Sequence, residues 1–74
     1  MYATHAERKL GIALGYEIHI DGNIGDTFSK PHSKGERRVW SIQEGWQTAD
    51  VIDDTYCNHL IFTDLSEALR RDPI

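Results

Sequence analysis

The 74-residue sequence predicts one α+β domain, in which a small antiparallel sheet of three or four strands has a C-terminal helix packed on one face. Three observations lead to this fold class. Apolar residues alternate with a period of two from Leu10 to Ile20, which is typical of a strand. Short apolar segments separated by turn residues follow, and a capped amphipathic segment ends the chain. A chain of this length builds one hydrophobic core at most, so we expect a single domain over residues 1–74.

The first twenty residues fit two patterns. The alternation of apolar residues favours a strand, but two glycines lower the strand propensity of the first half of this segment. Thr4 and Glu7 have the spacing of a capping box, which favours a helix that begins at Thr4. We therefore expect a short helix or an irregular arm over residues 1–9, followed by a strand over about 12–21.

The middle of the chain contains the turn and strand patterns that predict the rest of the sheet. Asp21, Gly22 and Asn23 have the chemistry of a turn. Residues 29–36 combine strand-breaking and polar residues, so we expect an exposed basic loop there. Further strands are expected at about 37–44, 46–52 and 59–63, with a hairpin tip at 43–46 and the end of a strand at 53–55, while residues 23–28 are less regular and are only a candidate for a short strand.

The C-terminal helix, expected over residues 64–71, has the clearest pattern. Asp64 and Glu67 have the spacing of an N-cap and its capping box, and an apolar stripe follows. Two arginines then complement the C-terminal end of the helix dipole. Pro73 is expected to stop the helix.

The strongest candidates for chemistry are Cys57 and His59, which lie two residues apart and would share one face of a strand. A nucleophilic pair also needs an orienting group and an oxyanion site, and the spacing identifies neither. Structural zinc sites usually contain paired ligands such as C-x₂-C, which do not occur here. We therefore expect a protein that is not an enzyme and holds no metal or cofactor. A small enzyme or metal protein around Cys57 and His59 is the alternative.

The formal net charge is −4, and the acidic and basic residues are separated along the chain. No lysine or arginine occurs between Val39 and Leu69, and the acidic residues of that segment are Glu44, Asp50, Asp53, Asp54, Asp64 and Glu67. If these six carboxylates converge on one side, they form a negative field that steers a basic partner. We expect Trp46, at the hairpin tip, and Tyr56 to be the aromatic anchors of that interface, and we expect Trp40 to lie in the core.

The basic residues suggest a different partner. Lys30, Lys34, Arg37 and Arg38 fall within nine residues, and such a patch can replace counterions along a phosphate backbone. A nucleic-acid-binding accessory or regulatory protein that uses residues 30–38 is therefore an alternative function. The acidic composition of the whole chain disfavours it, because stand-alone nucleic-acid-binding domains usually have a high pI.

These patterns together favour a small non-enzymatic protein-binding module that docks its acidic face on a basic surface of a larger protein, for example in a nucleic-acid-handling complex. In size, charge and lack of a catalytic motif the chain is similar to small phage-encoded inhibitors, including anti-CRISPR proteins. It has no signal-peptide pattern, no apolar segment near the ~18 residues of a membrane span, and one cysteine, so we expect a cytoplasmic protein without membrane contact. Homodimerisation would add buried surface to so small a domain.

Overall fold

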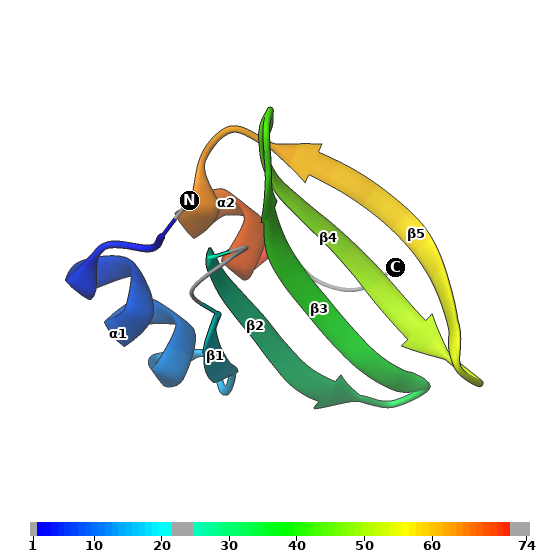
Figure 1. The fold of residues 1–74 in the computed structure, drawn as a ribbon. Helices are drawn as coiled ribbons and strands as arrows, with labels where there is room; N and C mark the ends of the chain where they lie inside the picture. The colour runs from blue at the N-terminus through cyan, green and yellow to red at the C-terminus, as the bar shows by residue number, and fades with distance from the viewer. Residues whose placement is uncertain (1, 22–24, 72–74) are drawn as a thin grey trace.

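A computed structural model describes residues 2–21 and 25–71. Its elements are α1 (His5–Ala13), β1 (Glu17–Asp21), β2 (Gly25–His32), β3 (Gly35–Ile42), β4 (Gly45–Ile52), β5 (Thr55–Phe62) and α2 (Leu65–Arg70). The five strands form one antiparallel sheet in which each strand pairs with its neighbours in the sequence (Figure 1). The predicted α+β class is confirmed. The prediction of three or four strands is wrong, because the sheet has five.

The helix at the N-terminus is longer than expected, and the first strand is shorter. Thr4 and Glu7 form the predicted capping box: the Thr4 hydroxyl accepts from the Glu7 N–H at 3.1 Å, and the Glu7 carboxylate accepts from the Thr4 N–H at 2.7 Å. The helix continues to Ala13, and Gly15 follows it with a φ of 92°. The strand expected from residue 12 therefore begins only at Glu17, because the helical cap and the left-handed glycine override the alternation of apolar residues.

Residues 29–36 do not form the expected basic loop. They lie in β2 and β3, which are joined by a turn at Ser33 and Lys34. The ladder pairs Ser29 with Arg38 and Lys30 with Arg37, so the backbone of these polar residues is hydrogen-bonded within the sheet. Polar side chains fit this hairpin because they alternate between its two faces. The predicted turn residues Gly22 and Asn23 lie outside the described part of the chain.

The core lies between one face of the sheet and the two helices, which are on the same side of the sheet in Figure 1. Phe28 is fully buried and makes edge-to-face contacts with the rings of Tyr16, at 6.1 Å, and Trp46, at 6.3 Å between centroids. Residues of α2 close this cluster, namely Leu65, Ala68 and Leu69. The expectation that Trp46 is exposed is wrong, since only 3% of it is accessible to solvent. Trp46 is the second residue of β4 and is not part of the turn, which is formed by residues 43–44.

Buried polar groups attach α2 to the sheet. Arg37, which is buried in β3, donates to the Tyr16 hydroxyl and to the carbonyl of Ala68, both at 3.2 Å. The Tyr16 hydroxyl in turn donates to the carbonyl of Leu69 at 3.1 Å. These carbonyls are in the last turn of α2, where a helix has no partner of its own to offer them. At the other end of α2, Asp64 is the predicted N-cap and accepts from the Glu67 N–H at 3.3 Å.

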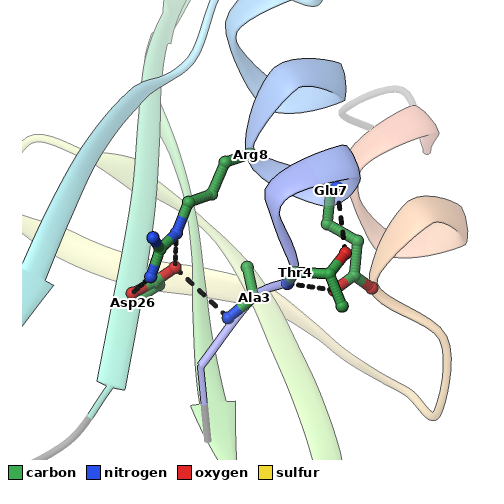
Figure 2. A network of polar contacts seen from close by, with 5 residues as sticks. All are labelled: Ala3, Thr4, Glu7, Arg8 and Asp26. Atoms are coloured by element: carbon green, nitrogen blue, oxygen red, sulfur yellow. Dashed lines mark hydrogen bonds and ion pairs between the residues drawn. The ribbon is translucent and has the colours of Figure 1, made fainter.

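A second polar network joins the N-terminal segment to β2 (Figure 2). The buried carboxylate of Asp26 accepts from Arg8 Nε at 2.8 Å, from Arg8 Nη2 at 3.2 Å and from the Ala3 N–H at 3.2 Å. The hydrogen bond to Asp26 raises the pKa of Arg8 above its ordinary value. The network therefore holds the segment before α1, and α1 itself, against the start of β2.

Candidate binding surface

The face of the sheet opposite the helices, which we call the helix-free face, carries the candidate site. Residues alternate along each strand between this face and the core. The ladder pairs Arg38 with Ala49 and Val51 with Tyr56, so these residues lie on the same side of the sheet. The residues that β3, β4 and β5 place on this face are Glu36, Arg38, Trp40, Ile42, Gln47, Ala49, Val51, Tyr56, His59 and Ile61.

Trp40, Tyr56 and His59 form an aromatic cluster on the helix-free face. The Trp40 ring makes edge-to-face contacts with Tyr56, at 5.9 Å between centroids, and with His59, at 6.4 Å. These rings come from β3 and β5 and meet across Ala49 of β4, which is fully buried although it faces away from the core. The small side chain of Ala49 leaves room for the rings to meet. The expectation that Trp40 lies in the main core is therefore wrong: Trp40 is half-buried on the opposite face.

Arg38 extends the cluster and holds Tyr56 in place. Its guanidinium lies 5.6 Å from the centroid of the Tyr56 ring and donates to the Tyr56 hydroxyl. It also pairs with Glu36, at 2.6 Å from Nε to the carboxylate. The hydrogen bond to Glu36, with a smaller contribution from Tyr56, raises the pKa of Arg38 above its ordinary value. Tyr56 is thus oriented from two sides while 45% of its surface remains exposed.

An open hollow is lined in part by Glu36, the ion-pair partner of Arg38. Its volume is about 300 Å³, and its lining residues are Gly15, Glu17, Ser29, Lys30, Pro31, Gly35 and Glu36. Among these residues, the Lys30 side chain is held in place, because the Lys30 ammonium is 3.4 Å from the Leu14 carbonyl and 4.6 Å from the centroid of the Tyr16 ring. The hollow therefore combines the carboxylate of Glu17 with that of Glu36, which is paired with Arg38, and with the Lys30 ammonium.

The six acidic residues expected to form one face do not come together. Asp50 is buried, accepts from Asn58 Nδ2 at 2.9 Å and lies 3.9 Å from Arg37. Asp53 and Asp54 form the exposed turn between β4 and β5. The other three are also exposed: Glu44 lies in the turn before β4, Asp64 caps α2 and Glu67 lies in α2. A strand of eight residues separates its two ends by roughly 25 Å, so Glu44 at one end of β4 does not form one acidic face with Asp53 and Asp54 at the other.

The four basic residues expected to form a nucleic-acid patch are also separated. Arg37 is buried in the core, and Lys30 points toward α1. Arg38 lies on the helix-free face, and Lys34 is in the turn between β2 and β3. The alternation of neighbouring strand residues separates Arg37 from Arg38, so the linear basic segment is not a continuous basic surface.

Cys57 and His59 lie on opposite faces of β5, contrary to the sequence prediction. The ladder shifts register between Thr48 and Asp50, and Asn58, with a φ of 56°, lies between Cys57 and His59. This β-bulge adds one residue to β5 and breaks the alternation. The Cys57 thiol approaches the Asp50 carbonyl at 3.6 Å, whereas His59 contacts Trp40. In the described ranges 2–21 and 25–71, no three histidine, cysteine or acidic side chains lie together as metal ligands would.

The sequence pattern indicates Tyr56 as an interface residue, but it does not indicate that Trp40, His59 and Ile61 share the helix-free face. The alternation of Arg38, Trp40 and Ile42 was the available signal, since it gives β3 a second large-residue face. No described helix is long and apolar enough to cross a membrane. Comparison with protein-family models, curated proteins and solved structures found no match.

Proposed function

We propose that this protein is a non-enzymatic binding module whose helix-free face docks on a basic surface of a larger protein. The observation that carries the proposal is the aromatic cluster with Arg38. Tryptophan, tyrosine and arginine are the residues that most often dominate the binding energy of protein interfaces. Here they are preoriented by one another on a rigid sheet, so little side-chain freedom is lost when a partner binds.

The charges around the cluster favour a basic partner. Asp53 and Asp54 follow β4 directly and precede Tyr56 by only a few residues, and both are exposed. Glu17 adds a further exposed carboxylate at the hollow, where Glu36 is already paired with Arg38. An arginine of the partner could also stack on the exposed Tyr56 ring. The basic lining of a nucleic-acid groove in a larger protein has this chemistry.

The backbone of the acidic turn supports a role for its carboxylates. Asp53 and Asp54 have φ values of 51° and 62°, so both lie in the left-handed region. Asn-Gly is the preferred pair for a two-residue hairpin turn with two positive φ values. Two adjacent aspartates in this conformation also repel each other. Aspartate accepts a positive φ more readily than most residues, so this turn keeps both carboxylates exposed a few residues before Tyr56, where a basic partner would contact them.

A comparison of charge-matched variants tests the proposal. Asp53→Asn with Asp54→Asn removes two charges beside the cluster, and asparagine also tolerates a positive φ. Glu44→Gln with Glu67→Gln removes two exposed charges away from the turn between β4 and β5, one in the turn before β4 and one in α2. A third variant, Tyr56→Ala, removes the exposed ring. Each variant and the wild-type protein would be immobilised and used to capture proteins from a nuclease-treated cell lysate at low and moderate salt.

We expect the wild-type protein to recover a basic protein, and its recovery to fall about ten-fold or more with Tyr56→Ala, which is the loss expected of a hot-spot residue. The aspartate variant should reduce recovery most strongly at low salt, and the glutamine variant should leave it unchanged. Equal recovery by all four proteins would exclude this face as the binding site. Capture of nucleic acid alone from an untreated lysate would instead favour the nucleic-acid-binding alternative.

A further inference from the structure

Strand β5 is an edge strand without charged side chains or proline, and its protection against pairing with another chain is limited to the bulge at Asn58. Among the described residues it pairs only with β4, so one side of its backbone has no ladder partner. Natural proteins usually protect such edges with lysine, other charged side chains or proline. The segment Thr55–Phe62 contains no lysine, arginine, aspartate, glutamate or proline. The other edge strand, β1, has Glu17 at its first residue and Asp21 at its last.

The exposed aliphatic side chain of β5 lies in the second half of the strand. No residue of β5 is fully buried, and Ile61 exposes 58% of its surface. The bulge at Asn58 interrupts regular pairing in the middle of the strand, because a bulge locally increases the twist of the edge. The regular part beyond the bulge, residues 59–62, is therefore the segment best able to pair with a further strand.

We infer that two copies of this chain form a symmetric dimer in which the second half of β5 pairs antiparallel with the same segment of the second copy, with Ile61 opposite Ile61 of that copy. A two-fold axis brings a segment opposite itself, and an uncharged segment can accept this without placing like charges opposite each other. The pairing satisfies edge backbone groups and covers Ile61. It also adds buried surface to a small domain whose own main core contains eight buried residues.

Dimerisation in this way would join the two sheets into one. Because the strands pair edge to edge, the helix-free faces of both copies would form one continuous surface that carries two aromatic clusters. The dimer does not depend on the binding function proposed above, since it rests on the edge of β5 and not on the face of the sheet. The two ideas can therefore fail separately.

Matched isoleucine variants test the dimer. Ile61→Lys places a charge on the β5 edge, and Ile20→Lys places the same charge on the β1 edge, where Ile20 is 62% exposed. Mass would be measured by light scattering on a size-exclusion column from about 1 to 200 μM, the range in which small interfaces associate. We expect the wild-type protein and Ile20→Lys to approach twice the 8.5 kDa chain mass, and Ile61→Lys to remain at 8.5 kDa.

A single-cysteine experiment gives a second measurement that does not depend on the lysine variants. In a Cys57→Ala background, Ile61→Cys should form a disulfide-linked dimer under mild oxidation, while Ile20→Cys should not. A wild-type protein that stays monomeric over the whole concentration range would overturn the inference. So would a dimer that persists in Ile61→Lys, or a crosslink that forms at residue 20 and not at residue 61.

Discussion

Replacing Gly11 with alanine should destabilise the protein, although the same change in the middle of most helices is stabilising. An ideal Cβ on Gly11 would lie 2.7 Å from Cε2 and 2.9 Å from Cδ2 of Phe28, whereas carbon atoms in contact are normally about 3.5–4.0 Å apart. The ring would have to move by nearly 1 Å. Phe28 is fully buried against the edges of Tyr16 and Trp46, so its ring cannot move alone.

The magnitude follows from two opposing effects. Alanine is better than glycine in a helix interior by about 1 kcal/mol. Overpacking a well-packed core costs about 1–3 kcal/mol, and the rigid surroundings of Phe28 favour the upper part of this range. We expect Gly11→Ala to lower the free energy of unfolding by about 1–2 kcal/mol, measured by urea denaturation with tryptophan fluorescence.

The control is the exposed position Lys9 in the same helix. There Lys9→Ala should be more stable than Lys9→Gly by about 1 kcal/mol, because no packing opposes the helix propensity. Combining Gly11→Ala with Phe28→Leu should cost less than the sum of the two single changes, since a smaller side chain relieves the clash. A Gly11→Ala variant that gains the stability seen at Lys9 would refute the packing argument.

The remaining predictions concern buried or capping polar groups. Thr48→Val should be neutral or stabilising by about 1 kcal/mol, because the buried Thr48 hydroxyl has no hydrogen-bond partner among the described residues; a loss in urea denaturation would contradict this. Arg37→Ala should lower the free energy of unfolding by about 3–5 kcal/mol, because it removes the positive charge beside the buried Asp50 carboxylate. Adding Asp50→Asn should recover part of this loss in the same urea assay. Hydrogen bonds, first from the Ser66 hydroxyl and then from backbone N–H groups, hold the pKa of Asp64 below its ordinary 3.8. The ionised Asp64 carboxylate therefore stabilises the folded protein above pH 3.8, and this stabilisation is lost as the pH falls below 3.8 through the lowered pKa. The urea midpoints of the wild-type protein and Asp64→Ala should converge at low pH.

Local signals predicted the helices better than the strands. The capping patterns at Thr4 and Asp64 each place a helix start correctly, because an N-cap acts through hydrogen bonds within one turn of chain. The polar segment 29–36 was expected to be a loop because its side chains are hydrophilic. It is strand because hydrogen bonds to a partner segment stabilise it, and such a partner cannot be read from the segment itself.

The candidate site was predicted only in part for a similar reason. Tyr56 was expected on the surface and lies there, but the choice between the two tryptophans was reversed. Both occur in strands with large residues on two faces, and alternation alone does not say which face meets the helices. Trp46 is on the core side because its strand face meets α2, and Trp40 is therefore left to form the aromatic cluster.

The sequence by itself determined the α+β class, the capped starts of both helices and the acidic residues beside Tyr56, because these depend on interactions between residues close in the chain. The tertiary structure decided which charges remain available at the surface. Arg37 and Asp50 are paired residues of adjacent strands and both face the core, so neither contributes to the surface expected of it. The bulge at Asn58 likewise separated Cys57 from His59. Strand register and the side on which the helices pack determine these outcomes, and both depend on contacts between segments distant in the sequence.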